Sequence, residues 1–129
     1  MTDPIADMFS RIRNAQAVKK PRILIPHSKI KYSILQLLKE SDFIGEIKKF
    51  RKKTSRIIEV KLKYEDGVGK ISELERISKP SRRLYIKAKD VRPVKRGFGF
   101  LILSTPKGIM KSTEARKQNI GGEIIGKVW

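Results

Sequence analysis

Residues 97–108 read Gly-Phe-Gly-Phe-Leu-Ile-Leu-Ser-Thr-Pro-Lys-Gly. A run of bulky apolar residues that begins after glycine and ends before a Pro-Lys-Gly segment is typical of a strand, which we expect at 98–104. The polar residues Ser-Thr-Pro-Lys-Gly predict a turn at the end of that strand. The stretch therefore favours a β-rich C-terminal half in which a rigid strand holds small hydrogen-bonding groups.

The segment before this strand is strongly basic. It carries eight cationic residues, with the aromatic ring of Tyr85 in their midst. Such a surface attracts a polyanion, and nucleic acid is the polyanion that fits it best. Charge explains attraction, whereas bases are read by hydrogen bonds, so we expect specificity to lie in the turn. The cationic residues are Lys79, Arg82, Arg83, Lys87, Lys89, Arg92, Lys95 and Arg96.

The excess of positive charge extends over the whole chain. Its 129 residues include 31 Lys and Arg against 13 Asp and Glu, which gives a net charge of +18. Residues 1–64 carry 16 basic and 6 acidic groups, net +10, and residues 65–129 carry 15 and 7, net +8. A basic tail on a neutral domain is thereby excluded, and an anionic partner is expected for the whole body. With 39% hydrophobic residues the chain can still build a core.

The first half has the pattern of two helices and three strands. Thr2-Asp3-Pro4 predicts a helix start, and Ser28 can cap a second helix. A basic hairpin loop at 51–55 leads into a strand in which apolar residues alternate with charged ones up to Tyr64. Shorter strands are expected at 22–25 and 46–50. The predicted order is αβαββ.

The second half is predicted to be mostly β. The loop-like stretch Glu65-Asp-Gly-Val-Gly is the best candidate boundary, so we expect domains at 1–64 and 65–129. The fold class is α+β, with two small packed domains: an N-terminal αβαββ domain and a mostly β C-terminal domain with a short helix. The elements expected in the C-terminal domain are strands at 71–77, 82–87, 98–104 and 122–128 and a helix at 112–118.

The residues give little support to catalysis or metal binding. The single histidine, His27, stands beside the expected helix cap, where a histidine is usually a surface or packing residue. A pairing with Ser104 is conceivable, but no feature of the sequence brings the two together. Without cysteine, a zinc site lacks ligands. We expect no enzyme, no catalytic residue, no metal and no cofactor. No apolar run approaches the roughly 20 residues of a bilayer span, so no membrane partner is expected either.

Several blocks of sequence, in order over essentially the whole chain, point to a known family. They are Asp3-Pro-Ile-Ala-Asp-Met-Phe-Ser-Arg-Ile-Arg-Asn-Ala15, Ile25-Pro26 with Ser28-Lys29, Arg76-Ile-Ser-Lys-Pro80 to Arg83-Leu-Tyr85, the stretch 97–108, Glu114-Ala-Arg116 and Gly121-Gly-Glu-Ile. With these blocks the chain resembles the small-subunit ribosomal protein eight family of the bacterial and organellar type.

The resemblance implies a structural constituent of the small ribosomal subunit. Such a protein binds the central domain of small-subunit ribosomal RNA early, helps to assemble the platform and touches neighbouring ribosomal proteins. In some bacteria a relative also represses its own operon by binding a messenger RNA that mimics the ribosomal site. The expected location is the ribosome in the cytoplasm, with an organellar ribosome as an alternative.

Carried over position by position, the resemblance puts the main RNA surface in the second half. Tyr85 offers a stacking face, Ser104 and Thr105 offer compact hydrogen-bonding groups, and Gly122 permits close backbone approach. The carboxylate of Glu123 either accepts from a base amino group or orients a neighbouring cation. The expected RNA-binding residues are Arg83, Tyr85, Ser104, Thr105, Lys107, Gly108, Gly122 and Glu123, with secondary contacts from Arg11, Arg13, Asn14, Lys52 and Lys53.

Several positions depart from the usual family pattern. Ser81 stands in for a usual glycine, and Gly126-Lys127 replaces the usual Cys-Tyr, which removes an aromatic ring and adds a charge. Pro106 stands in place of a serine of the turn, which removes a hydroxyl and a backbone donor. Lys111 stands where a threonine usually caps the short helix, so we expect the cap at Ser112.

Two other functions stay open beside the ribosomal one. The first is a free translational repressor that acts on messenger RNA. The second is an RNA-modifying or RNA-cleaving enzyme, for which the sequence offers no evident base, metal set or cofactor loop. Co-sedimentation with ribosomal subunits separates the ribosomal constituent from the enzyme.

Overall fold

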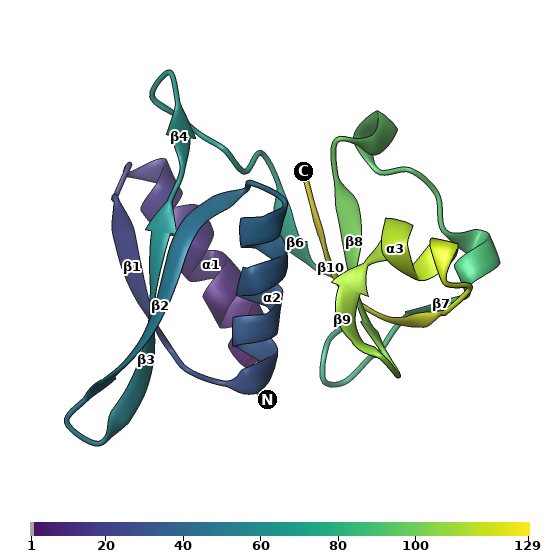
Figure 1. Cartoon of the computed structure of the whole chain (residues 1–129), viewed down its shortest axis with the longest axis horizontal. Coiled ribbons are helices and arrows are strands. Elements are labelled where there is room, and N and C mark those ends of the chain that lie inside the picture. The colour runs from purple at the N-terminus through teal and green to yellow at the C-terminus, as the bar shows by residue number, and fades with distance from the viewer. Residues whose placement is uncertain (1) are drawn as a thin grey trace. The chain divides into compact units, whose positions relative to one another are not determined.

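The computed structural model describes residues 2–129 and divides into two compact units. The N-terminal unit comprises Asp7–Ile71, and the C-terminal unit comprises Ser72–Trp129 together with the residues up to Ala6. Both contain helix and antiparallel sheet (Figure 1), so the predicted α+β class is confirmed. Along the sequence, the boundary between the compact units falls after Ile71 and not after Tyr64. The division into separate domains at 64/65 stays a prediction.

The N-terminal unit packs helices against a three-stranded antiparallel sheet of order β1-β3-β2. Along β3, Ile58, Val60 and Leu62 are buried whereas Lys61 is exposed, because successive side chains of a strand point to opposite faces. Apolar side chains of both helices complete this core. The elements follow the predicted αβαββ order: α1 (Pro4–Ala17), β1 (Arg22–Pro26), α2 (Lys29–Glu40), β2 (Ile44–Lys52) and β3 (Ser55–Leu62).

Both helices begin at the predicted polar residues. The Asp3 carboxylate accepts a hydrogen bond of 3.1 Å from the backbone N–H of Ala6. The Ser28 hydroxyl accepts one of 3.2 Å from the N–H of Lys31. Each oxygen satisfies an N–H group that has no partner within its own helix.

A small hairpin of β4 (Tyr64–Glu65) and β5 (Val68–Gly69) replaces the expected loop at 65–69. Its turn uses left-handed backbone at Asp66 and Gly67, with φ of 53° and 76°. The amide of Gln16 then holds the following Ile71, donating to its carbonyl at 2.6 Å and accepting from its N–H at 3.2 Å. These bonds attach the segment to the N-terminal unit.

The C-terminal unit is built around one sheet of order β6-β10-β8-β9, with β7 also paired to β10. One edge of strand β10 pairs with two short strands. Gly122 and Glu123 pair with β7, and residues 126–128 pair with β6. The strands expected at 71–77 and 82–87 are therefore shorter than predicted. The elements are β6 (Leu74–Arg76), β7 (Tyr85–Ile86), β8 (Phe100–Thr105), β9 (Gly108–Lys111), α3 (Ser112–Lys117) and β10 (Gly122–Val128), with a short 3-10 helix at Ala88–Asp90 and a turn with positive φ at Lys95–Gly97.

The prediction that Ser112 caps the short helix is wrong. Lys111 occupies the N-cap position without a side-chain capping bond, and Ser112 is the first residue of α3. The buried Ser112 hydroxyl instead accepts a 2.9 Å hydrogen bond from the backbone N–H of Leu101 in β8. A buried strand donor without a partner costs more than an uncapped exposed helix end, so the hydroxyl serves the strand.

Candidate nucleic-acid interface

Three of the predicted RNA-binding residues lie in one row across the C-terminal sheet. Glu123 of β10 is directly opposite Tyr85 of β7 on one side and Ser104 of β8 on the other. Ile109 of β9 continues the row beyond Ser104. Residues directly opposite one another in a ladder point to the same face, so the sheet presents these side chains together.

The exposure of this row differs from strand to strand. Tyr85 on β7 is 69% exposed, whereas Ile102, which shares the face of Ser104 along β8, is fully buried. Ser104 and Glu123 are half-buried. The ring of Tyr85 is thus available for stacking, and the two polar groups beside it are held on paired backbone.

The two hydroxyls after the apolar run have different environments. Within residues 2–129 the Ser104 hydroxyl has no hydrogen-bond partner. The Thr105 hydroxyl donates to the carbonyl of Gly108 at 2.8 Å and accepts from the N–H of Lys107 at 3.1 Å. Ser104 lies in β8, within the strand expected at 98–104, and Thr105 also belongs to β8 and pairs with Gly108 of β9, so the turn is shorter than predicted. The Thr105 hydroxyl proton is therefore engaged in a hydrogen bond within the turn, whereas the Ser104 hydroxyl proton has no acceptor within residues 2–129.

The glycines of the site have structural reasons to be glycine. Gly108 follows the turn with φ of +111°, a conformation that side chains with Cβ rarely adopt. A Cβ at Gly122 would lie 2.4 Å from the backbone oxygen of Ser104. Gly122 therefore permits the close approach of β10 to β8, which keeps Glu123 beside Ser104. Lys107 occupies the exposed turn between β8 and β9.

Arg83 extends the row on the side of β7. Its Nη1 lies 3.4 Å from the Glu123 carboxylate, with an exposed guanidinium and a largely covered carboxylate. This contact is compatible with the orientation of a neighbouring cation, one of the two roles expected for Glu123, and its role toward RNA stays a prediction. This bond uses one of the arginine's five N–H donors. The other four belong to an exposed group and are available to a ligand.

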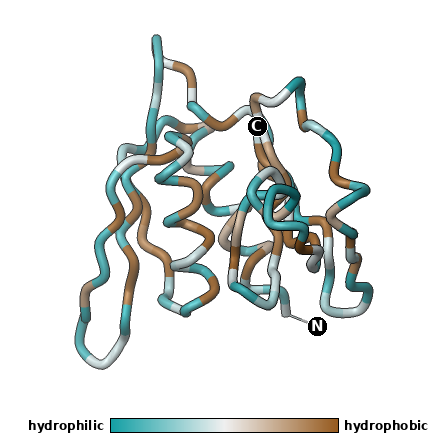
Figure 2. Tube along the Cα trace, turned by 45° about the vertical axis from the view of Figure 1, so that its right-hand side comes forward, coloured by the Kyte–Doolittle hydropathy of each residue, from teal (hydrophilic) through white to brown (hydrophobic). Residues whose placement is uncertain are grey.

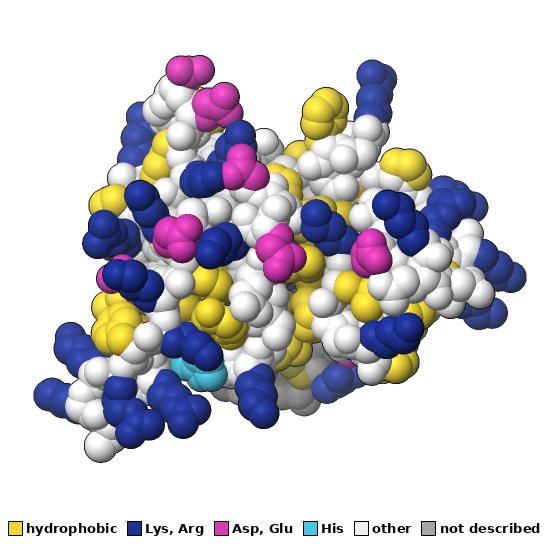
Figure 3. Space-filling view, viewed as in Figure 1, with side chains coloured by type: hydrophobic (Ala, Val, Ile, Leu, Met, Phe, Trp, Pro, Cys, Tyr) yellow, Lys and Arg dark blue, Asp and Glu magenta, His cyan; other side chains and the backbone are white. Residues whose placement is uncertain are grey.

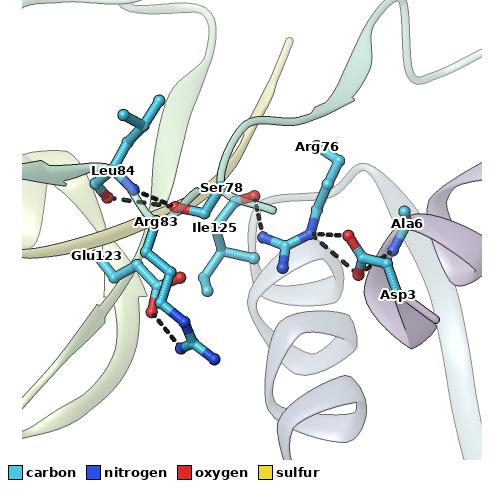
Figure 4. Close-up of polar contacts among 8 residues, drawn as sticks. All are labelled: Asp3, Ala6, Arg76, Ser78, Arg83, Leu84, Glu123 and Ile125. Atoms are coloured by element: carbon cyan, nitrogen blue, oxygen red, sulfur yellow. Dashed lines mark hydrogen bonds and ion pairs between the residues drawn. The ribbon is translucent and has the colours of Figure 1, made fainter. Parts of the chain in front are cut away.

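Ser78 fixes the segment that carries Arg83 and Tyr85, and sequence reasoning gave it no role. Its fully buried hydroxyl accepts a 2.9 Å bond from the N–H of Leu84 and donates to the Leu84 carbonyl at 3.3 Å (Figure 4). The same carbonyl accepts from the N–H of Ile124 at 2.8 Å. Leu84 is thereby bound both to Ser78 and to β10. In the sequence, the position of this serine directly after the strand expected at 71–77 was the one sign of such a role.

A second polar cluster contacts the middle of β10 at Ile125. The Arg76 guanidinium contacts the Asp3 carboxylate at 3.1 Å and donates to the Ile125 carbonyl at 2.8 Å (Figure 4). The side chains of Arg76 and Asp3 are only 13% and 17% exposed. The start of the chain is in this way bound to the strand that carries Glu123.

The secondary residues of the N-terminal unit fall into separate places. Arg11 and Asn14 of α1 share a hollow of about 750 Å³ with Lys20 and Arg22. Arg11 also forms an exposed ion pair of 3.0 Å with Asp7. Arg13 lies outside this hollow's lining and donates to Ser10 Oγ at 3.2 Å.

Lys52 and Lys53 lie elsewhere, at the tip of the β2–β3 hairpin. Lys52 ends β2, and Lys53 takes a left-handed φ of 57° in the turn. Figure 2 shows this tip without hydrophobic residues. Arg22 pairs with Lys61 at the opposite end of β3, so about 20 Å of strand separates the tip from the hollow on α1.

One titratable group near Arg11 departs from its ordinary behaviour. Burial lowers the pKa of Lys31 on α2, and the positive charge of Arg11 lowers it further, while Asp7 partly offsets both. Lys31 is thus a buried cation in a unit that already carries a large positive charge.

Among residues 2–129 no group of three His, Asp or Glu side chains is placed to hold a metal ion. In the same part of the chain no helix has the length and apolar character to cross a membrane. His27 belongs to the N-terminal unit and Ser104 to the C-terminal unit.

Comparison with known proteins identifies the family. The sequence profile described as "Ribosomal protein S8" matches residues 3–129. The chain belongs to the ribosomal protein S8 family. The S8 family consists of structural ribosomal proteins, so the expectations of a ribosomal constituent and of a protein that is not an enzyme are confirmed.

Curated S8 relatives cover the whole chain. "Small ribosomal subunit protein uS8" of Leptospira biflexa is 46% identical over 130 residues, which span 100% of this chain and 98% of the relative. The protein of the same name from Persephonella marina is 46% identical over 135 residues, spanning 100% and 99%. That of Bartonella henselae is 44% identical over 130 residues, spanning 100% and 98%. The S8 resemblance seen in the motifs therefore extends over the full length.

Proposed function

We propose that this S8 protein binds the central domain of small-subunit ribosomal RNA directly and helps to assemble the platform of the subunit. A structural role in the small ribosomal subunit follows from membership of the S8 family. The proposal adds the RNA region, the stage of assembly and the residues that carry recognition.

The observation that carries the proposal is the row of Tyr85, Glu123 and Ser104. An exposed ring and a hydroxyl without a partner within residues 2–129 lie on either side of Glu123, whose carboxylate contacts the Arg83 guanidinium. Unpaired RNA bases are recognised by stacking and by hydrogen bonds to their exposed edges. This row offers both interactions on a rigid scaffold, which lowers the entropy lost on binding.

The remaining predicted residues supply charge around that row. Lys107 lies at the exposed turn, and Arg11, Arg13, Asn14, Lys52 and Lys53 lie on the N-terminal unit. Contacts from lysine and arginine to phosphate fix the position of the RNA but carry little sequence information. Neighbouring ribosomal proteins are proposed as further partners. A messenger RNA from the protein's own operon is proposed as an alternative ligand of the same row.

The test is a binding measurement with a central-domain RNA fragment and a scrambled RNA of equal length. With about five phosphates neutralised, affinity for either RNA falls by two decades or more between about 50 and 200 mM salt. We expect the central-domain fragment to bind more tightly than the scrambled RNA at both salt concentrations. Equal affinity for both RNAs would show that only charge is recognised and would overturn the proposal. An operon leader RNA serves as a third ligand.

A further inference from the structure

A second feature of the molecule, separate from the row on the C-terminal sheet, is a basic hollow near the tip of the β2–β3 hairpin. It has a volume of about 360 Å³ and is lined by His27, Lys49, Phe50, Arg51 and Arg56. Figure 3 shows Lys and Arg side chains gathered at this hairpin, lower left, next to the single histidine. None of the lining residues was among those expected to bind RNA.

Two of the lining cations face each other without a neutralising partner. Arg51 of β2 is directly opposite Arg56 of β3 in the antiparallel ladder. Lys49 lies two residues before Arg51 and hence on the same face of the strand. Like charges directly opposite one another destabilise a strand pair. The fold therefore holds three positive groups together at a cost that an anion would remove.

Carboxylates of the described chain do not neutralise this hollow. Among residues 2–129 no ion pair involves Lys49, Arg51 or Arg56. The acidic residues of the two strands are engaged elsewhere, Glu46 with Lys39 and Glu59 with Arg22. The charge of the hollow is thus uncompensated within residues 2–129.

The neighbouring helix adds to the positive potential and contacts two of the lining side chains. His27 directly precedes Ser28, the N-cap of α2, whose first turn contains no acidic residue. The N-terminal end of a helix carries a partial positive charge. Tyr32 on that helix contacts both walls: the Lys49 ammonium lies 4.7 Å from the ring centroid, and the His27 ring lies 6.1 Å from it. Tyr32 thus lies between Lys49 and His27 and contacts both.

We propose that this hollow is a phosphate-binding site, in which Arg51 and Arg56 bind the phosphate oxygens while Lys49 and His27 complete the wall. Planar guanidinium groups match tetrahedral phosphate through paired N–H donors, which distinguishes them from lysines that act as point charges. The ligand is a phosphate group, supplied either by the backbone of the bound RNA or by free inorganic phosphate. The RNA source rests on the proposed function, whereas the phosphate chemistry does not.

The first arm of the test uses inorganic phosphate on the full chain. Melting temperature is measured in sodium phosphate and in sodium chloride at matched ionic strength. We expect a rise of about 2–5 °C at phosphate concentrations near ten times the dissociation constant. Arg51→Gln and Arg56→Gln should abolish the rise, while Lys52→Gln and Lys53→Gln, which remove the same charge from the same hairpin, should keep it. No rise, or an equal loss in all four variants, overturns the site.

Loss of folding is excluded by the same measurements. Without phosphate, Arg51→Gln and Arg56→Gln should melt at or above the wild-type temperature, because each removes the repulsion between two facing arginines. A lower melting temperature without phosphate contradicts the like-charge argument on which the site rests.

The second arm identifies the source of the phosphate. With the central-domain RNA fragment, Arg51→Gln and Arg56→Gln should lose about tenfold in affinity and the two lysine variants about twofold, if the RNA backbone occupies the hollow. Equal losses in all four variants, together with a positive first arm, assign the site to free phosphate. If the wild type does not prefer the central-domain fragment, the proposed function fails while the first arm still decides the site.

Discussion

The hydroxyl of Ser78 is bound to both backbone polar groups of Leu84, accepting from its N–H at 2.9 Å and donating to its carbonyl at 3.3 Å. The next residue after Leu84 is Tyr85, whose ring is the proposed stacking surface. One buried oxygen thus fixes the backbone that carries an exposed recognition group.

We expect Ser78→Ala to destabilise the protein by about 1–3 kcal/mol, because it leaves a buried N–H without an acceptor. It should also weaken binding to the central-domain fragment, since Tyr85 loses its anchored backbone. Chemical denaturation and RNA binding are measured on the same variant. Tyr85→Ala, which removes the exposed ring itself, is the control and should lower affinity without lowering stability. Unchanged RNA affinity in Ser78→Ala would show that Leu84 is held by β10 alone.

Ser104→Ala tests base recognition. The hydroxyl has no partner within residues 2–129, so its loss should leave the free energy of unfolding nearly unchanged. We expect a loss of roughly 1–3 kcal/mol in binding to the central-domain fragment and almost none with scrambled RNA. Affinity and melting temperature are measured in parallel. An affinity equal to the wild type places base recognition elsewhere.

Thr105→Val should have the opposite effects. Its hydroxyl bonds the backbone of Lys107 and Gly108, so the substitution should cost about 1 kcal/mol of stability. The ratio of affinities for central-domain and scrambled RNA should stay the same. Thr105→Ser keeps the hydroxyl and is the matched control. A change in that ratio for Thr105→Val, with normal stability, contradicts the structural role given to this residue.

Arg76→Met removes a largely buried partner of Asp3. The variant leaves the Asp3 carboxylate without its cation and the Ile125 carbonyl without a donor. We expect a destabilisation of about 2–4 kcal/mol by urea unfolding. Arg11→Met breaks the exposed pair with Asp7 and should cost less than about 0.5 kcal/mol. Similar costs for the two variants would mean that burial of the Asp3 pair adds nothing.

Lys31 predicts a pH-dependent stability. Because burial lowers the pKa of Lys31 from its ordinary value of 10.5, the unfolded chain binds this proton more tightly than the folded chain. Stability due to this group therefore rises as pH increases through the window below 10.5, and at neutral pH the buried charge opposes folding. Lys31→Met should raise the melting temperature at pH 7, with a smaller advantage towards pH 10. The exposed Lys29→Met, which removes one charge from the same helix, is the matched control.

The sequence by itself determined the elements whose signals are local. Helix starts at Asp3 and Ser28 follow from an oxygen next to free N–H groups, and β3 follows from strict alternation of apolar and charged residues. The blocks along the chain likewise sufficed to indicate the family. The net charge of +18 was enough to predict a polyanionic partner.

Only the tertiary structure decided how distant residues meet. The register of β10 with β7 and β8 puts Glu123 between Tyr85 and Ser104, and it also explains the short strands at 74–76 and 85–86. The use of the Thr105 hydroxyl by its own turn, the binding of Leu101 by Ser112 and the facing of Arg51 and Arg56 depend on the same pairing. Local patterns report what a residue prefers, whereas a hydrogen-bond partner many positions away is fixed only when strands pair and the core closes.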